Sequence, residues 1–399
     1  MKTREVKLGE VANVKGGKRI PKGIGLINIP NGHPYIRVRD LNKKRVLELD
    51  NSYEYVDNET QKVISKYTVK TGDVVLSIVG TIGLVAIVGR TLDGANLTEN
   101  CVKLSSFHGV NRDFLYYYLR SDCGQQEIRC GTVGAVQAKL PIKNIQNIAI
   151  NLPDYTTQER IASLLLSIDR KIELNQKIND NLEQQAVTYF QELYINNANP
   201  MWQIGTISDL GTVVGGSTPS KTKPEYYTNN GIAWITPKDL SINKSKFISH
   251  GENDITELGL KNSSATVMPK GTVLFSSRAP IGYIAIASNE VTTNQGFKSV
   301  VPYLEIGTAF VYFFLKHSLP VIESAASGST FKEISGSAMK NIPAIIPDRS
   351  TLDQFNSFCA PIFAQQKILE DQNYSLAMLR DSLLPKLMSG AIDIASIQL

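Results

Sequence analysis

Three short runs of the sequence come close to motifs that carry chemistry, and each lacks a residue that the chemistry requires. The run GGSTPSKT at residues 215–222 resembles a phosphate-binding loop, but Ser220 stands where that loop needs its second glycine. The Pro-Asp pairs at 153–154 and 347–348 are typical of metal-dependent nucleases, yet no E-x-K follows them. The run NGHPY at 31–35 lacks the first proline of an amino-methyltransferase motif. We therefore expect a solvated basic loop at 215–222, and at each Pro-Asp pair a strand end before a long helix.

The side chains that most often bind metals or act as nucleophiles are scattered along the chain. The histidines assemble neither a triad nor a metal site, and the cysteines show no CxxC spacing. Thiols spaced in this way are typical of structural cysteines in a reducing compartment. We therefore expect a non-catalytic chain with no cofactor and no metal of its own. The histidines are His33, His108, His250 and His317, and the cysteines are Cys101, Cys123, Cys130 and Cys359.

Positive charge is concentrated at the start of the chain. Residues 1–50 contain twelve Lys or Arg against five Asp or Glu, a net +7, whereas the whole chain carries +5. Such asymmetry is expected of a surface that meets a polyanion such as DNA. Arg37 and Arg39 are the strongest candidates, because alternate residues of a strand face one side. For every candidate the alternative is a solvated surface charge. The candidate DNA-binding residues are Lys18, Arg19, Arg37, Arg39, Gln137, Lys139, Lys221, Lys223, Lys238, Arg278 and Lys332.

The segments that are expected to position these residues occur twice in the sequence, as an internal repeat. PYIRVRDL at 34–41 aligns with AWITPKDL at 233–240, which places Lys238 opposite Arg39. TGDVVLSIVGTIGLVAI at 71–87 aligns with KGTVLFSSRAPIGYIAI at 270–286, and both pairs share an offset of 199 residues. A period of this length is that of a domain rather than of a solenoid repeat. We expect two similar globular α/β domains.

Each copy contains the same local elements. Two β-rich runs flank GTIG or APIG, where Gly83 and Gly282 are expected to supply a tight turn. The aromatic runs DFLYYYLRS at 113–121 and AFVYFFLKH at 309–317 predict short core helices, because aromatic residues at such density are far more often buried than exposed. We expect domains at 1–154 and 198–348, each followed by a long helical region, at 155–197 and 349–399.

The two helical regions have matching apolar stripes. NIAINLP before the first and NIPAIIP before the second align at an offset of 194, which continues into both helices. Apolar residues three and four apart predict a coiled coil. Two such helices in one chain most simply pack on each other, with polar residues on the seam fixing the register. The alternative is that each helix packs separately on its own domain. The expected polar seam residues are Asn175, Asn179, Gln365 and Gln372.

A helical spacer of this length suits a protein that reads two places on a duplex. A helix over residues 157–193 would run ~55 Å at 1.5 Å per residue. Half-sites on one face of DNA lie roughly 34–36 Å apart. Two related but diverged basic modules therefore predict a split, asymmetric recognition sequence. The expected fold class is α+β, with two similar globular α/β domains separated by two long coiled-coil helices; the family resemblance given next implies that these are target-recognition domains and that the helices are antiparallel.

The chain resembles the specificity subunits of type I restriction–modification systems. LRDSLLPKLMSG at 379–390 is similar to their C-terminal conserved region, and QERIASLLLSIDRKIELNQKINDNLE to their central one. LSIVGTIGLVAIV and FSSRAPIGYIAIA resemble their target-recognition domains. The resemblance implies a DNA-specificity subunit bound to double-stranded DNA, two methyltransferase subunits and two motor–nuclease restriction subunits. Those partners supply the chemistry of S-adenosylmethionine, ATP and magnesium. One departure is YFQEL at 189–193 in place of LLPKL, so the helix ends are expected to dock partners unequally.

Two other function classes stay open. One is an assembly scaffold that does not read DNA, and the other is a fragment of a fused restriction–methylation enzyme, which the starting Met disfavours.

No apolar run approaches the roughly 18–20 residues that a membrane span needs. The N-terminus MKTREVKLGEVA lacks the apolar core of a signal peptide. We therefore expect a cytoplasmic protein with no membrane partner.

Overall fold

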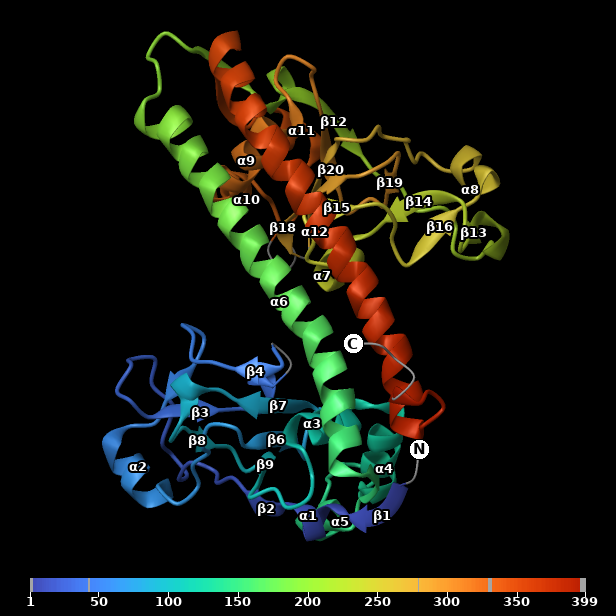
Figure 1. Ribbon diagram of the computed structural model, residues 1–399. Coiled ribbons are helices and arrows are strands. Elements are labelled where there is room, and N and C mark those ends of the chain that lie inside the picture. The colour runs from blue at the N-terminus through green and yellow to red at the C-terminus, as the bar shows by residue number, and fades with distance from the viewer. Residues whose placement is uncertain (1–2, 42–43, 279, 329–331, 395–399) are drawn as a thin grey trace. The chain divides into compact units, whose positions relative to one another are not determined.

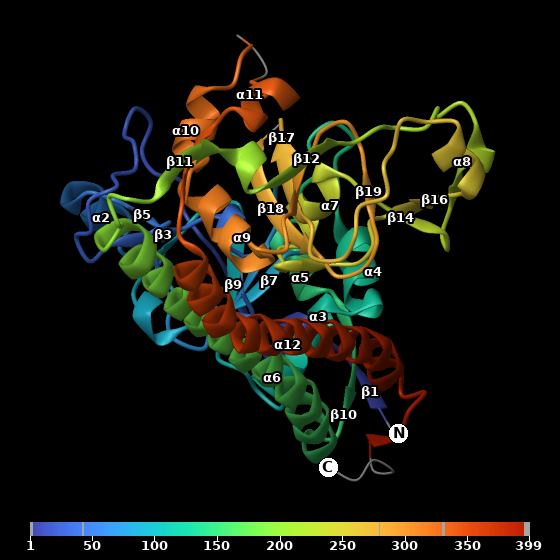
Figure 2. The ribbon, with the colours of Figure 1, turned by 90° about the horizontal axis from the view of Figure 1, so that it is seen from above.

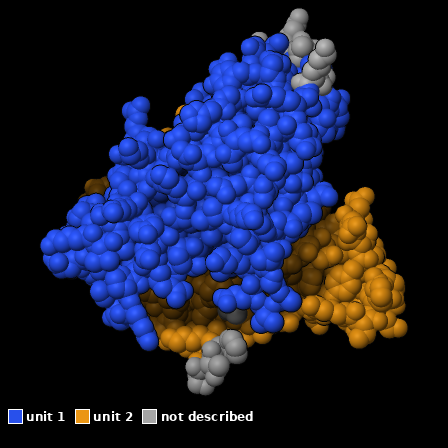
Figure 3. Space-filling model, turned by 90° about the horizontal axis from the view of Figure 1, so that it is seen from below, with its two compact units in different colours: residues 1–171, 375–399 blue, residues 172–374 orange. Residues whose placement is uncertain are grey.

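The computed structural model describes residues 3–41, 44–278, 280–328 and 332–394 of the 399. The chain forms two compact units, which Figure 3 distinguishes by colour: unit 1 is residues 1–171 with 375–399, and unit 2 is residues 172–374. Two long helices, α6 (Tyr155–Phe190) and α12 (Arg349–Ser389), each give one part to each unit. No helix in the described ranges is both long and apolar enough to span a membrane.

Unit 1 contains one five-stranded sheet and two smaller sheets (Figure 1). Its strands are β1 (Thr3–Lys7), β2 (Asn13–Gly16), β3 (Pro34–Ile36), β4 (Val46–Leu47), β5 (Glu54–Tyr55), β6 (Val74–Ser77), β7 (Val85–Val88), β8 (Asn96–Leu97), β9 (Cys101–Ser105) and β10 (Ala149–Pro153). The sheet orders are β2-β9-β6-β7-β4, β5-β3-β8 and β1-β10. The pairs β4–β7 and β3–β8 are parallel and the others antiparallel. The short helices are α1 (Leu8–Val11), α2 (Asn58–Ile64), α3 (Arg112–Arg120), α4 (Asp122–Gly131) and α5 (Ile142–Gln146).

Unit 2 contains the corresponding sheets. Its strands are β11 (Gln203–Thr206), β12 (Gly211–Gly215), β13 (Tyr227–Thr228), β14 (Ile232–Ile235), β15 (Phe247–Ile248), β16 (Asn253–Ile255), β17 (Val273–Ser277), β18 (Ile281–Ala287), β19 (Thr292–Thr293), β20 (Lys298–Pro302) and β21 (Pro343–Ile346). The sheet orders are β12-β20-β17-β18-β15, β13-β16-β14-β19 and β11-β21. The short helices are α7 (Pro237–Ile242), α8 (Glu257–Lys261), α9 (Thr308–His317), α10 (Leu319–Ser324) and α11 (Gly336–Lys340).

The two units repeat one topology. The five-stranded sheets match strand for strand, and the parallel pairs β4–β7 and β15–β18 occupy the same edge. The parallel pair β14–β19 matches β3–β8, and β11–β21 matches β1–β10. Two similar α/β domains and two long helices are therefore confirmed, within the expected α+β class. Where one domain ends and the next begins stays a prediction, because the units divide both long helices.

Two glycines near the β6–β7 and β17–β18 hairpins share a positive φ but not a position. Gly83, with φ of 94°, lies in the turn between β6 and β7, where an added Cβ would lie 2.6 Å from Gln125 Oε1. The expected tight turn is confirmed there. Gly282, with φ of 97°, lies inside β18 instead, opposite a register shift between Phe275 and Ser277. It serves an irregular strand pair rather than the turn, because β18 begins before it.

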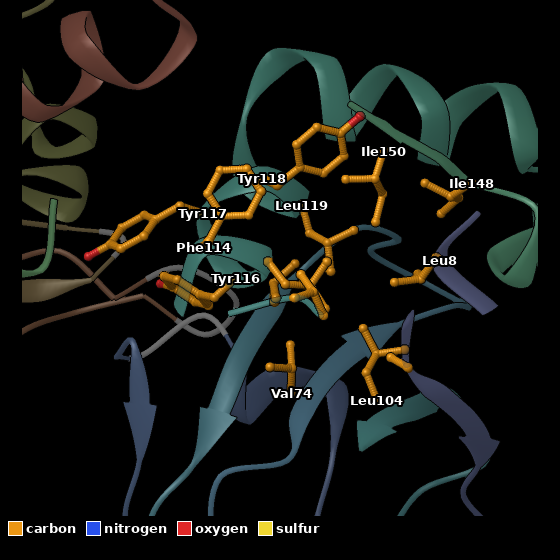
Figure 4. Close-up of a cluster of buried hydrophobic side chains, with 14 of the residues drawn as sticks. Leu8, Val74, Leu104, Phe114, Tyr116, Tyr117, Tyr118, Leu119, Ile148 and Ile150 are labelled. Carbon is orange, nitrogen blue, oxygen red and sulfur yellow. The ribbon is translucent and has the colours of Figure 1, made fainter. Parts of the chain in front are cut away.

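The core of unit 1 forms where α3 covers the five-stranded sheet. Figure 4 shows the aromatic side chains of α3 among those of β6, β9 and β10. Tyr116, Tyr117 and Tyr118 are at most 3% exposed, which confirms a buried aromatic helix over most of residues 113–121. The start of α6 and the end of α12 complete this cluster, through Ile161 and Leu387 among others.

The core of unit 2 is built in the same way around α9. Phe190 of α6 lies 6.0 Å from the ring of Phe313 in α9 and 5.6 Å from that of Phe355 in α12. All three rings belong to one buried cluster. The expected core helix at 309–317 is therefore confirmed.

A buried ion-pair network joins the sheet of unit 2 to both long helices. Lys246, just before β15, pairs with Glu183 of α6 and donates to Gln366 Oε1 of α12 at 2.6 Å. Lys316 of α9 also reaches Glu183, at 2.6 Å. Burial would raise the pKa of Glu183, but the two lysines lower it below its ordinary value. Burial raises the pKa of Glu370, which accepts the backbone N–H groups of residues 246 and 247.

The Pro-Asp pairs introduce the long helices. Asp154 Oδ1 accepts the backbone N–H of Thr157 at 2.9 Å, at the first turn of α6. Asp348 Oδ1 accepts the N–H of Thr351 at 2.9 Å, at the first turn of α12. These hydrogen bonds lower the pKa of both carboxyl groups, as expected of helix caps. Helix capping therefore explains both Pro-Asp pairs without a nuclease motif.

The parts of α6 and α12 within unit 2 pack against each other in antiparallel fashion, as Figures 1 and 2 both show. Asn175 Nδ2 donates to Asn373 Oδ1 at 2.9 Å and to Gln372 Oε1 at 3.3 Å. Gln366 Nε2 donates to the carbonyl oxygen of Asn179 at 3.2 Å. The alternative in which each helix packs only on its own domain is therefore wrong.

The expected seam is correct on α6 and partly wrong on α12. Gln365 is exposed, whereas its neighbour Gln366 is 3% exposed and faces α6. Phe358 is 38% exposed, whereas Cys359 is buried. The buried stripe therefore runs one residue later at alternate positions. Apolar periodicity could not find it, because polar residues occupy those seam positions: Gln366, Asn373 and Arg380.

Candidate nucleic-acid interface

In unit 1, backbone hydrogen bonds join the segments that follow three strands. Lys18 N, after β2, donates to Leu97 O at the end of β8, at 2.8 Å. Thr98 N donates to Ile36 O at the end of β3, at 3.1 Å. The loop after β2, the end of β3 and the end of β8 therefore lie side by side. We call this row of loop ends, with the matching row in unit 2, the strand-end edge.

A hairpin loop extends the strand-end edge of unit 1. Val133 and Lys139 exchange two backbone hydrogen bonds of 2.9 Å, and Leu140 N donates to Ile78 O at 3.0 Å, directly after β6. The tip of the loop, between Val133 and Lys139, carries the exposed Gln137 and also Val136, whose relative exposure is 101%. The expected DNA-binding residues Gln137 and Lys139 are thus brought to the same edge as the loop after β2.

Lys18 and Arg19 both lie in that loop with exposed side chains. The ammonium of Lys18 stands 5.6 Å from the ring centre of Tyr67. Arg19 Nε donates to Glu99 Oε1 at 2.6 Å, although the side chain is 78% exposed. Burial would raise the pKa of Glu99, but the hydrogen bond from Arg19 contributes to a net lowering. A carboxylate therefore orients this guanidinium at the surface.

Arg37 and Arg39 lie together for a reason other than the one expected. The strand β3 ends at Ile36, and Arg39 belongs to a one-turn 3-10 helix, η1 (Val38–Asp40), so strand alternation was the wrong argument. The turn forms because Asp40 Oδ2 accepts the backbone N–H of Arg37 at 2.8 Å. Both guanidinium groups nevertheless pair with Glu54, Arg39 at 2.6 Å. Asp40 also lies 3.8 Å from Arg39, so two acids hold the two arginines at the surface.

Unit 2 repeats the strand-end edge bond for bond. Ser217 N donates to Thr293 O at 2.9 Å, as Lys18 N does to Leu97 O. Asn294 N donates to Ile235 O at 3.0 Å, as Thr98 N does to Ile36 O. Ile334 N donates to Ser277 O at 3.0 Å, as Leu140 N does to Ile78 O. The same row of loop ends therefore exists in both units.

The expected unit 2 residues on this edge have mixed surroundings. Lys238 lies in α7 and is 63% exposed, and its Nζ pairs with Glu252 at 2.5 Å. It therefore matches Arg39, which pairs with Glu54 from an equivalent turn. Arg278 lies 3.4 Å from Glu333, and both side chains are 38% exposed. Lys332 is exposed beside it.

The basic loop at 215–222 is not built to hold a nucleotide phosphate. It leads into a three-residue 3-10 turn, η5 (Pro224–Tyr226), rather than into the helix N-terminus that a phosphate-binding loop requires. An added Cβ on Gly216 would lie 2.0 Å from Asn294 O, so this glycine allows two backbones to approach closely. Lys221 and Lys223 are exposed, and Lys223 lies 3.8 Å from Glu225. Both lysines follow Ser217 in the chain, and neither takes part in the backbone hydrogen bonds that define the strand-end edge.

Reading the sequence for basic residues missed the acids and amides of the edge. Glu54 and Glu99 hold the arginines of unit 1, and Glu252 and Gln295 occupy the corresponding places in unit 2. Their signal is weak, because Glu99 lies 80 residues from the Arg19 that it orients. No local pattern in the sequence marks them, because each lies far along the chain from the residue that it contacts.

No group of three or more His, Cys, Asp or Glu side chains that could hold a metal ion occurs among the residues described. Cys101 and Cys359 are buried, and burial raises the pKa of the Cys359 thiol to about 12. Cys123 and Cys130 are exposed free thiols on α4. The geometry offers an exposed polar edge in each unit, on which basic side chains pair with acids.

The repeated fold also allows the chain to be compared with known protein families. The family model described as "Type I restriction modification DNA specificity domain" matches residues 2–184 and 199–371. The chain belongs to this family, which confirms the resemblance seen in its motifs.

Two curated relatives carry names that agree with this assignment, and one solved structure has the same fold. The MjaIX specificity subunit of Methanocaldococcus jannaschii is 43% identical over 162 residues, which are 40% of this chain and 37% of that subunit's own length. The HindI specificity subunit of Haemophilus influenzae is 23% identical over 341 residues, 67% of this chain and 73% of that protein. The crystal structure of an S subunit from M. genitalium has the same fold, with a TM-score of 0.58 at 16% identity over 97% of this chain and 96% of that one.

Proposed function

We propose that this chain is the specificity subunit of a type I restriction–modification complex and reads a split, asymmetric DNA site. The carrying observation is the strand-end edge, which recurs in both units with the same backbone bonds but with different side chains. One fold with two sets of recognition groups suits two half-sites of different sequence. The alternative of a scaffold that does not read DNA is not favoured, since the family is described by DNA specificity.

The proposal assigns the eleven expected residues to DNA contact in two tiers. Those on the strand-end edge would read or orient bases: Lys18, Arg19, Arg37, Arg39, Gln137, Lys139, Lys238, Arg278 and Lys332. Those beyond it, Lys221 and Lys223, would meet phosphates. Phosphate contacts fix the position of a protein on the duplex, whereas base contacts specify sequence.

The partners are part of the same proposal. We propose two methyltransferase subunits and two motor–nuclease restriction subunits, which would carry the catalysis, while this chain stays non-catalytic and binds no cofactor of its own. We also propose the domain limits at 154, 197 and 348, and the starts of α6 at Tyr155 and of α12 at Arg349 support the first and the last of them. Because such partners act on DNA inside the cell, the proposed location is the cytoplasm.

The test is to exchange residues 1–154 for the matching module of another family member and to co-produce the chimera with the methyltransferase. Sequencing of methylated sites should show one half of the recognised sequence changed and the other half kept. The control is the unchanged chain with the same methyltransferase. Methylation without sequence preference, or a change in both halves at once, would contradict two independent readers.

A further inference from the structure

The strand-end edge holds one pair of side chains that differs in kind between the two units. Arg19 follows Lys18, whose N–H bonds Leu97 O, and Thr218 follows Ser217, whose N–H bonds Thr293 O. The facing residues are Glu99 and Gln295, each two positions after the accepting carbonyl. The pairs Arg19–Glu99 and Thr218–Gln295 therefore occupy the same place in the repeat.

In unit 1 the facing residue is an acid that holds the arginine with one oxygen and a threonine hydroxyl with the other. Glu99 Oε1 accepts Arg19 Nε at 2.6 Å, and Glu99 Oε2 accepts Thr98 Oγ1 at 3.0 Å. Within the residues described, neither Nη atom of Arg19 has a hydrogen-bond partner, and the side chain is 78% exposed. A guanidinium held by Nε presents its two Nη groups outward. That fork matches the O6 and N7 acceptors of guanine in the major groove.

In unit 2 the corresponding group is an amide. The hydroxyl of Thr218 donates to Oε1 of Gln295, whose side chain is exposed. The amide oxygen keeps a second lone pair, and its NH2 group keeps both protons for other partners. An amide with one acceptor and one donor free matches the N6 and N7 edge of adenine.

We infer that Arg19 and Gln295 are the base-reading residues at equivalent places of the two half-sites, Arg19 taking guanine and Gln295 taking adenine. Glu99 and Thr218 are their positioning residues. This inference rests on the proposed function and deepens it, because it names the groups that make the two half-sites differ.

The experiment exchanges one pair for the other in the intact complex. The double variant Arg19→Thr with Glu99→Gln is co-produced with the methyltransferase, and its methylated sites are sequenced. We expect one position of one half-site to change its preference from guanine to adenine, by about 5- to 150-fold, the range of one bidentate base contact. All other positions should stay as in the parent.

The matched control is Lys62→Thr with Glu59→Gln on α2, which removes an exposed ion pair of the same 2.6 Å length in the same unit. It should leave every position unchanged. The reciprocal variant, Thr218→Arg with Gln295→Glu, should move the other half-site from adenine to guanine, and it decides the matter if the first variant does not assemble.

Two outcomes overturn the inference while leaving the proposed function intact. One is a double variant that methylates the parent site with all base preferences unchanged. The other is an even loss of binding at all sequences with a weaker salt dependence, which would make Arg19 a phosphate contact. A parent complex that methylates without sequence preference would instead overturn the proposed function itself.

Discussion

Asn175 and Asn373 meet across the two long helices, with Asn175 Nδ2 donating to Asn373 Oδ1 at 2.9 Å. Asn175 is 0% exposed, and its own Oδ1 has no hydrogen-bond partner in the described structure. A polar residue on a coiled-coil seam lowers stability and fixes register. This amide pair therefore defines which residues of α6 and α12 face each other in unit 2.

Removing one amide should cost stability, and removing both should not. Asn175→Ala leaves the half-buried amide of Asn373 without its partner and should lower the free energy of unfolding by about 1–3 kcal/mol. The double variant Asn175→Leu with Asn373→Leu should be near neutral or more stable. Urea unfolding followed by helical circular dichroism measures both. A double variant less stable than the single one would contradict a role in register rather than stability.

Asp169 should be the most sensitive acid of unit 1. It is 6% exposed and accepts the hydroxyl of Tyr117 at 2.6 Å and Arg380 Nη1 at 2.8 Å. Asp169→Ala removes the buried partner of the half-buried Arg380 guanidinium and should lower the free energy of unfolding by about 2–4 kcal/mol. The control is Asp381→Ala, which removes the 61% exposed partner of the same arginine and should cost less than about 1 kcal/mol. If urea unfolding shows the same loss of unfolding free energy in both variants, Asp169 is not the more important of the two partners of Arg380.

The Glu183 cluster should make unit 2 sensitive to acid. Its two lysines hold the pKa of Glu183 below the ordinary 4.5, so its contribution is present above the unfolded-state pKa and is lost as pH falls through the folded one. The raised pKa of Glu370 acts with the opposite sign. Urea unfolding from about pH 6 to pH 3 should show stability falling in the parent and a flatter profile in Glu183→Gln. The exposed Glu59→Gln should keep the parent profile.

The repeat, the fold class and the seam of α6 could be predicted because apolar spacing reports them directly. The seam of α12 was shifted at alternate positions, because Phe358 and Leu379 are more apolar than the residues that face α6, such as Gln366 and Arg380. Burial there is decided by hydrogen bonds across the helix pair. The spacing of apolar residues cannot predict those hydrogen bonds.

The site could be predicted only in part for a similar reason. Basic charge pointed to Arg19 and Arg39, but their orientation depends on Glu99 and Glu54. Glu99 meets Arg19 because the backbone hydrogen bond from Lys18 to Leu97 joins the ends of β2 and β8, and the sequence near either residue does not predict this contact. The argument from strand alternation at Arg37 failed because a capping aspartate, Asp40, turns the chain first.

Arg39 and Lys238 should act on separate half-sites. Each pairs with an acid from an equivalent turn, at 2.6 Å and 2.5 Å. If Arg39→Ala removes a base contact, specificity should relax by about 1–3 kcal/mol in one half-site, and Lys238→Ala should do the same in the other. If the contact is to phosphate, the salt slope should fall by about one instead. Binding of the complex to single-base variants of its site distinguishes the two. No change in either variant would remove both residues from the interface.

The central claim is that the helix pair is a ruler between two readers of DNA. Because Asn175 faces Asn373, and Gln366 reaches Asn179, the position opposite Asn181 lies close to Gln366. Seven residues inserted after each of these two positions keep the 3.5-residue seam in phase and add ~10.5 Å of rise, about three base pairs at 3.4 Å each. Four residues in each helix add ~6 Å, about two base pairs, through a stutter in the coil.

The deciding measurement is the sequencing of methylated sites for both insertion variants beside the parent, each produced with the methyltransferase. The account predicts that both half-sites keep their bases while the spacer between them lengthens by about two base pairs for the shorter insertion and about three for the longer. A variant that still methylates with an unchanged spacer would contradict the account, because the helices would then connect the readers without setting the distance between them.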